Sequence, residues 1–273
     1  MTAKVFNPVL LMAGNPSPMT GPGNNTYLIA ADEGSAALVD AGVGAPAHLA
    51  ELAAALEAHR ARLTDVLVTH GHADHASGAT SLALAHAGAR FHKQPWRGQD
   101  EQFDVAWSPI ADGQTVLAGH DELTVVATPG HSPDHLSFWH APSRTMFTGD
   151  LVALGTSVMI HASRGGNLAD YMRSLERILA YEPRVLLPAH GPRVDDPRAL
   201  VTGYLNHRRE RETQVLAALD AGHATVEAIA ESIYHDLSPA LLPAARENVR
   251  AHLEKLRVEG RAAFDGGRWN SRG

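Results

Sequence analysis

The stretch Thr69-His70-Gly71-His72-Ala73-Asp74-His75 follows the largely apolar run from Leu63 to Val68. Four strong metal-binding side chains, three imidazoles and one carboxylate, fall within the six residues from His70 to His75. Groups packed this closely repel one another and lose hydration unless a cation holds them. This hexad therefore predicts a bound divalent metal at the end of a buried strand.

Three further candidate ligands each stand at the end of a predicted strand, next to glycine or proline. They are His131 in Pro129-Gly130-His131, Asp150 in Thr148-Gly149-Asp150, and His190 in Pro188-Ala189-His190-Gly191. Loops at strand ends are where a rigid scaffold exposes reactive side chains, and glycine lets the backbone approach a site. Because the chain has no cysteine, histidine, aspartate or glutamate must hold any metal.

Strands and helices alternate in a pattern that predicts two packed β-sheets with outer helices, an α/β fold. Strands are expected at 5–12, 26–30, 36–40, 65–69, 115–117, 123–128, 136–140, 145–148 and 185–188, and helices at 46–59, 77–87 and 168–180. After Asp195-Asp196-Pro197, helices are expected at 200–219, 226–234 and 244–259, with a hairpin over 261–269. Helices followed by a hairpin are typical of a winged helix. We therefore expect one domain over 1–201 and a second over 202–273.

Composition limits the classes of partner. The 273 residues carry a net charge of −7, with 13 basic and 20 acidic residues in 1–201 and 10 of each in 202–273. A surface without basic excess argues against strong non-specific binding to duplex nucleic acid, but not against a short single strand. The 17 histidines favour a metal enzyme.

The N-terminal residues lack the apolar run of a signal peptide, and no segment approaches membrane-spanning length. The sequence therefore predicts a soluble, cytoplasmic protein without membrane contact. It gives no indication of the oligomeric state.

The order of hexad, later histidine, aspartate and final histidine resembles the metallo-β-lactamase superfamily, over residues 5–195. The resemblance implies an αββα sandwich that forms the catalytic domain. It also implies a dinuclear site in which His70, His72 and His131 bind one metal, Asp74, His75 and His190 bind the second, and Asp150 bridges both. Five imidazoles and two carboxylates suit zinc, and iron or manganese could also occupy such a site.

Two divalent ions in such a site would share a bridging hydroxide, which is the expected nucleophile. Asp74 is the expected catalytic residue, since the family implies that it also orients this hydroxide. Zinc β-lactamases place a cysteine where this chain has Asp150. Glyoxalase II, lactonase and nuclease branches are the better match, and β-lactam hydrolysis is expected at most as a side activity.

The segment from Tyr204 to Glu212 and the winged-helix pattern resemble β-lactamase-like proteins that carry a C-terminal winged helix. That group includes a mitochondrial single-strand endoribonuclease and fungal thioesterases that act on polyketide carriers. We predict a hydrolase of a small ester, thioester or lactone, with single-stranded RNA as the alternative substrate. A third hypothesis is a winged-helix DNA-binding regulator with a metal-sensing domain, but glutamates offset much of the basic charge of the last helix.

Several residues have both a functional and a structural interpretation. Asp40, at the end of a strand, either supports the hexad from behind or forms a turn. Thr156, Ser157 and His161 either line the substrate pocket or belong to a surface loop. Asp134 and His135 are expected to form hydrogen bonds at a strand start rather than to bind metal.

Two segments leave the same choice open. The loop from Gly14 to Asn25 either overhangs the metals or is a connector. The basic stretch from Asn206 to Arg211 is expected to form a solvated or salt-bridged helix face, with contact to a substrate phosphate as the alternative.

Overall fold

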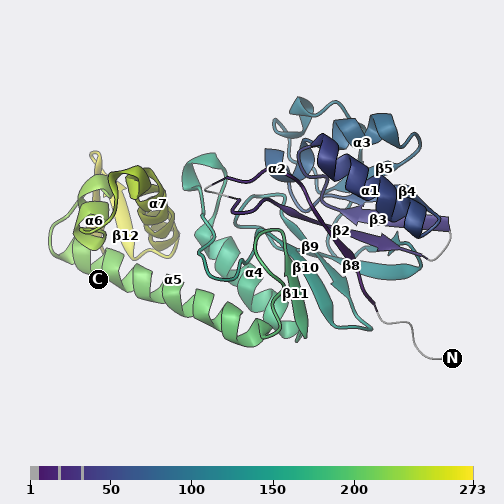
Figure 1. The fold of residues 1–273 in the computed structure, drawn as a ribbon. Coiled ribbons are helices and arrows are strands. Elements are labelled where there is room, and N and C mark those ends of the chain that lie inside the picture. The colour runs from purple at the N-terminus through teal and green to yellow at the C-terminus, as the bar shows by residue number, and fades with distance from the viewer. Residues whose placement is uncertain (1–5, 18–19, 32–33, 273) are drawn as a thin grey trace.

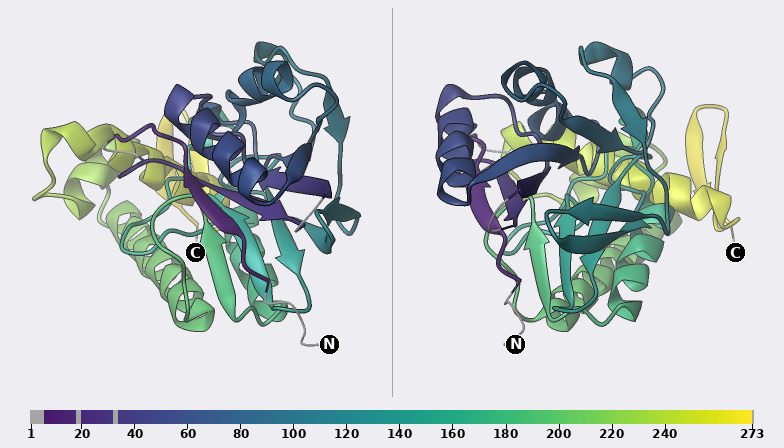
Figure 2. Two further views of the ribbon diagram at one scale, coloured as in Figure 1. Left: turned by 45° about the vertical axis from the view of Figure 1, so that its right-hand side comes forward. Right: turned by 90° about the vertical axis from the view of Figure 1, so that its right-hand side faces the viewer.

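Two β-sheets face each other in the computed structural model, which describes residues 6–17, 20–31 and 34–272 (Figure 1). Helices cover the outer face of each sheet, and a small helical unit with a hairpin lies at the C-terminal end (Figure 2). The predicted αββα sandwich with a C-terminal winged helix is therefore confirmed.

The first sheet has six strands in the order β1-β2-β3-β4-β5-β6. Their bounds are Val9–Met12 (β1), Asn25–Ala30 (β2), Gly34–Val39 (β3), Ala61–Leu67 (β4), Arg90–Lys93 (β5) and Trp107–Pro109 (β6). The first three strands pair antiparallel, and β3 to β6 pair parallel. Helices α1 (Pro46–Ala58) and α3 (Ala79–Ala85) connect the parallel strands and bury leucines against this sheet.

The second sheet has five strands in the order β11-β10-β9-β8-β7. Their bounds are Thr115–Ala118 (β7), Asp121–Ala127 (β8), Leu136–His140 (β9), Thr145–Gly149 (β10) and Val185–Pro188 (β11). Helix α4 (Leu168–Ala180) joins β10 to its parallel neighbour β11. Apolar side chains from both sheets, among them Leu67, Leu123 and Phe138, fill the space between them.

The C-terminal part is built on the long helix α5 (Pro197–Asp220). It continues with α6 (Val226–Ile233), α7 (Leu242–Val258) and the hairpin of β12 (Ala262–Asp265) and β13 (Arg268–Ser271). The first half of α5 packs in one cluster with α4, while its second half packs with α6, α7 and Trp269. The expected division between residues 201 and 202 lies inside this shared helix, and it stays a prediction.

Strands β5 and β6 were not predicted from the sequence. Strand β5 has the sequence Arg90-Phe91-His92-Lys93, whose three basic residues do not suggest a buried strand. Asp65 on β4 compensates two of them, at 2.9 Å from Arg90 and 2.8 Å from His92. This pairing partner lies far away in sequence, so local pattern alone cannot reveal the strand.

Two other expectations differ from the structure. The expected strand 5–12 begins at Val9, and Val5 lies outside the described residues. The expected helix 77–87 is shorter, as α3 (Ala79–Ala85), and the separate turn α2 (Ala73–Ala76) precedes it; between the two, the backbone of Gly78 packs against Ala41. A Cβ built at Gly78 would lie 2.1 Å from the oxygen of Ala41.

Among the described residues, no helix is long and apolar enough to cross a membrane.

Leu123→Ala should lower the free energy of unfolding by about 3 kcal/mol, because Leu123 is fully buried between the sheets. The measurement is urea unfolding followed by circular dichroism. Leu117→Ala on the neighbouring strand β7 is the matched control, since Leu117 is 63% exposed and should change stability by less than about 0.5 kcal/mol. Equal losses for the two variants would contradict the assignment of the core.

Candidate metal centre

The seven predicted ligands come together at one edge of the sandwich. Strand β4 ends at Leu67, just before the hexad, and β8 ends at Ala127, before His131. Strand β10 leads directly into Asp150, and β11 ends at Pro188, two residues before His190. These strand ends are tied together by backbone hydrogen bonds, such as Leu136 N to Thr69 O at 2.8 Å.

Glycines beside the ligands allow this close approach. Gly130 precedes His131 with φ +135°, and a Cβ there would lie 2.2 Å from the backbone nitrogen of Tyr171. Gly149 precedes Asp150 with φ +48°, and a Cβ there would lie 2.7 Å from Nε2 of His135. A side chain at either position would displace the neighbouring ligand.

The first group of donors consists of three imidazoles. Nδ1 of His72 lies 2.9 Å from Nε2 of His70 and 2.9 Å from Nε2 of His131. His131 directs its other ring nitrogen, Nδ1, to the carbonyl of Met159 at 3.0 Å, so this nitrogen is the donor and Nε2 keeps its lone pair. His72 can offer at most one proton from Nδ1, which cannot satisfy both facing nitrogens. A cation between the three rings would satisfy all of them.

The second group of donors has the spacing of a tetrahedral site. Oδ1 of Asp150 lies 3.2 Å from Nε2 of His190 and 3.3 Å from Nε2 of His75. Oδ2 of Asp74 lies 3.6 Å and 3.7 Å from the same two nitrogens. Metal bonds of 2.0–2.2 Å give a tetrahedron with edges of about 3.3–3.6 Å. The donors therefore fit a divalent ion such as zinc.

Asp150 faces both groups. Its Oδ1 belongs to the second group, whereas Oδ2 lies 3.5 Å from Nε2 of His131 in the first. The three clusters that could each hold an ion, His70-His72-His131, His70-His75-Asp150 and Asp74-His75-His190, form one continuous set of donors. The structure thus brings all seven predicted ligands together, and their binding of two ions stays a prediction.

The histidines of the two donor groups differ in their pKa values. Burial, together with the neighbouring imidazoles, lowers the pKa of His70 well below its usual value and that of His72 to about 4. Burial acts in the same direction on His190, but hydrogen bonds to Asp150 and Asp74 overcome it and raise the pKa of His190 to about 9. A divalent ion competes for the same lone pairs, so its binding would release protons from the second group.

Asp40 supports the hexad from behind. Its Oδ2 accepts a hydrogen bond from Nδ1 of His75 at 2.8 Å, which directs Nε2 of that ring toward the second group. Its Oδ1 accepts from the backbone N–H and the hydroxyl of Thr69, at 2.8 and 2.9 Å. Asp40 has φ +62°, a conformation that aspartate and asparagine tolerate better than most residues. Of the two interpretations offered for Asp40, the structure favours support of the hexad.

Asp134 and His135 form hydrogen bonds at the start of β9, as expected. Asp134 is buried, accepts from the backbone N–H of Gly71 at 2.7 Å and lies 3.0 Å from Nζ of the buried Lys93. Nε2 of His135 accepts from the backbone N–H of Asp150 at 3.0 Å. Both residues therefore hold ligand-bearing backbone without joining the donor groups.

The loop from Gly14 to Asn25 contributes two asparagines that sequence reasoning did not single out. The side chain of Asn24 donates to Oδ2 of Asp74 at 3.1 Å. The side chain of Asn25 donates to the carbonyls of Pro188 and Gly191, at 2.9 and 2.7 Å, and so fixes the loop that carries His190. The available signal was the adjacent pair of asparagines at the start of β2. Residues 18–19 of this loop lie outside the described residues.

The three predicted pocket residues, Thr156, Ser157 and His161, differ in their exposure to solvent. Thr156 and Ser157 are exposed, and the backbone carbonyl of Thr156 accepts from the hydroxyl of Tyr204 at 2.7 Å. His161 is half-buried, and its pKa is lowered by burial and by the nearby guanidinium of Arg164. Trp96, which sequence reasoning missed, has its ring 5.9 Å from that of His72. Trp96 therefore lies beside the first group of donors.

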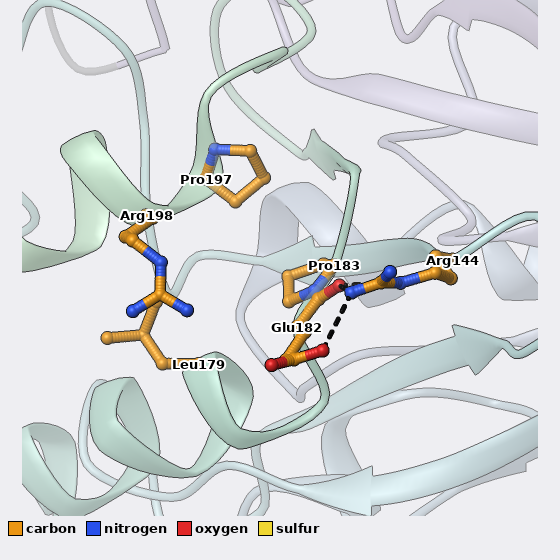
Figure 3. Close-up of a pocket in the computed structure, with 6 residues that line it drawn as sticks. All are labelled: Arg144, Leu179, Glu182, Pro183, Pro197 and Arg198. Carbon is orange, nitrogen blue, oxygen red and sulfur yellow. Dashed lines mark hydrogen bonds and ion pairs between the residues drawn. The ribbon is translucent and has the colours of Figure 1, made fainter.

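A surface hollow lies away from this centre (Figure 3). It is lined by Arg144, Leu179, Glu182, Pro183, Pro197 and Arg198. Arg144 directly precedes β10, and Pro183 lies just before β11, so the hollow is at the ends of these strands opposite to Asp150 and His190. Arg144 binds the carboxylate of Glu182 at 3.1 Å, which connects the two strand starts.

Comparison with known proteins agrees with this geometry. Residues 19–190 match the family described as the metallo-beta-lactamase superfamily, and residues 225–269 match the beta-lactamase associated winged helix domain. The chain belongs to the metallo-beta-lactamase superfamily. Members of this superfamily are metal-dependent hydrolases, and this chain is one of them.

A relative and two solved structures illustrate the similarity. The beta-lactamase-like protein 2 homolog of Drosophila melanogaster is 32% identical over 266 residues, which cover 93% of this chain and 88% of the relative. A metallo-beta-lactamase family protein from Thermus thermophilus has the same fold, with a TM-score of 0.78, 23% identity and coverage of 97% and 98%. A protein solved in a di-iron-bound form has a TM-score of 0.54, 24% identity and coverage of 70% and 97%.

Asp40→Asn should weaken zinc binding by about 10-fold or more, because it replaces the carboxylate that orients His75. The affinity is measured by competition with a chromophoric chelator. Asp65→Asn is the matched control, since Asp65 is also a buried aspartate but pairs with Arg90 and His92 outside the donor groups. Wild-type zinc affinity in the Asp40 variant would show that its contact with His75 has no bearing on the metal.

Proposed function

We propose that the chain is a dinuclear hydrolase that uses a metal-bridging hydroxide to cleave a small ester, thioester or lactone. The observation that carries this proposal is the carboxylate of Asp150, which directs one oxygen to each donor group. Such a carboxylate suits two ions held side by side. Zinc is proposed because the donors are mostly imidazole. Iron is the alternative, since a protein of the same fold was solved with two irons.

Two bound ions would supply a Lewis acid for the scissile carbonyl and a water with its pKa lowered to about 7. The protein would orient the nucleophile and the substrate with its carboxylates. The side chain of Asp74 is 30% exposed, against 14% for Asp150, so Asp74 is the carboxylate that a substrate can reach. Asn24 fixes Oδ2 of Asp74. We propose that Asp74 orients the attacking hydroxide.

The distribution of charge favours an acyl substrate over a polyanion. Four of the eight lysines and arginines on α5 and α7 are paired with glutamates, and a fifth, Arg208, is buried. These pairs are Arg209–Glu176, Arg250–Glu247, Lys255–Glu212, Lys255–Glu259 and Arg257–Glu254. A nucleic-acid-binding surface would instead present unpaired basic groups to phosphates. In the basic stretch, Arg209 is exposed and salt-bridged as expected, whereas Arg208 is buried and does not belong to a solvated face.

The pairing of lysines and arginines with glutamates also affects the hypotheses of a DNA-binding regulator and of an RNA substrate. The structure gives little support to a DNA-binding regulator, because three basic residues of α7 face glutamates on the same helix or directly after it. Single-stranded RNA stays the alternative substrate, since the same ions can activate water toward a phosphodiester. We propose a small-molecule partner, a cytoplasmic location, and β-lactam hydrolysis at most as a side activity.

A turnover screen of the zinc-loaded protein tests this proposal. The substrates are an acyl thioester, an aryl ester, a lactone, a β-lactam and a labelled single-stranded RNA. We expect turnover of at least one acyl substrate, with a loss of about 100-fold or more in Asp74→Asn, because that variant removes a carboxylate that orients the hydroxide and belongs to the second donor group. Metal removal with a chelator should abolish the same activity.

Asp121→Asn is the control for this screen, because Asp121 contacts His140 at the start of β8, away from the donor groups. It should retain wild-type turnover. Cleavage of the RNA without turnover of any acyl substrate would contradict the proposed acyl substrate and support single-stranded RNA instead. Full acyl turnover by Asp74→Asn would remove Asp74 from the reaction.

A further inference from the structure

Helix α5 contacts the loop that connects two parts of the metal centre. Tyr204 and Arg208 lie one turn apart on α5 and therefore share a face of the helix. The hydroxyl of Tyr204 approaches the carbonyls of Ala153 and Thr156, at 2.8 and 2.7 Å. Arg208 donates from Nη2 to the carbonyl of Val158. Two neighbouring side chains of α5 thus contact three carbonyls of one loop.

This loop, residues 151–159, starts directly after the donor Asp150 and ends at Met159, which contacts the donor His131. Asp150, which faces both donor groups, directly precedes it. Met159, adjacent to Val158, accepts through its carbonyl the hydrogen bond from Nδ1 of His131. The Met159 carbonyl therefore helps to orient the His131 ring, and α5 holds the carbonyl of the preceding residue, Val158.

Packing alone does not explain why Arg208 is an arginine. The side chain is 1% exposed, and none of the carboxylates in the described part of the chain pairs with it. Its guanidinium instead lies over the ring of Tyr171, 5.3 Å from the ring centre, and its Nε has no described partner. A buried cation without a counter-charge costs free energy that an apolar side chain would avoid. The retained charge points to a role beyond filling space.

Arg208 also connects the loop to the winged helix. Its Nη1 donates to the side-chain oxygen of Asn248 on α7, at 3.3 Å. Asn248 in turn donates to the hydroxyl of Tyr234, which follows α6, at 3.0 Å. A continuous series of hydrogen bonds thus runs from the C-terminal domain to the loop and reaches His131 through the adjacent Met159.

We propose that Tyr204 and Arg208 are positioning residues through which the C-terminal domain sets the metal affinity of the His70-His72-His131 group. This inference rests on the dinuclear centre proposed above. It gives the winged helix a function in this chain that does not require binding of nucleic acid. The carbonyl of Met159 is the contact through which the effect reaches the metal ligand.

Cobalt titration of the metal-free protein tests the proposal. Arg208→Met and Tyr204→Phe should each weaken one of two Co²⁺ binding steps, by about 10-fold for the arginine variant, and should change the visible spectrum of the bound Co²⁺. The second binding step should stay close to that of the wild type. Arg208→Lys keeps the charge but cannot reach both acceptors, so it should restore the affinity only in part.

Two substitutions serve as matched controls. Arg209→Met removes the next arginine of α5, which is 55% exposed and pairs with Glu176. Tyr181→Phe removes a phenol that lies near Trp139 at the end of α4. Both controls should bind Co²⁺ as the wild type does. A purely structural role of Arg208 would lower its unfolding midpoint without changing Co²⁺ affinity or spectrum.

Wild-type Co²⁺ affinity and spectrum in folded Arg208→Met would overturn the proposal. If that variant does not fold, Tyr204→Phe decides the question, because it removes only a hydroxyl. If the wild type itself does not bind two Co²⁺ ions, the dinuclear centre fails and this inference fails with it. Two ions in the wild type with unchanged binding in both variants would refute the positioning role alone.

Discussion

The structure depends on the close packing of seven metal-binding side chains that the fold holds at one edge of a β-sandwich. Imidazole nitrogens 2.9 Å apart, and carboxylates that share neighbours with them, are not stable together without positive charge. Several strand ends, buried aspartates and tight glycine turns hold these groups in place. A divalent cation is the compensation that we propose, and Asp40 is buried where it holds one of the proposed ligands, His75.

Much of this centre could be predicted because its ligands follow a local rule. The hexad concentrates four ligands in six residues, and His131, Asp150 and His190 each follow a strand at a glycine or proline. Helix α4 and strand β11 were predicted with their observed bounds, because their apolar patterns are clear. Local patterns carry this information since strand ends and helix periodicity depend on near neighbours.

The remaining parts could not be predicted, because they depend on contacts between residues far apart in sequence. Strand β5 is stabilised by Asp65 and Asp134, which neutralise its basic side chains. Asn25 fixes the loop of His190 by donating to Gly191, 166 positions away in the chain. Arg208 belonged to a stretch interpreted as a solvated face, and the structure buries it against the loop before Met159. None of these partners leaves a pattern in the nearby sequence.

The central claim is that one carboxylate, Asp150, lies between two metal ions. Anomalous X-ray diffraction at the zinc absorption edge, from crystals of the zinc-loaded protein, tests it most directly. The account predicts two fully occupied peaks about 3.5–4 Å apart, one among His70, His72 and His131 and the other among Asp74, His75 and His190, with Asp150 contacting both. A single peak, or two peaks that Asp150 does not bridge, would contradict it.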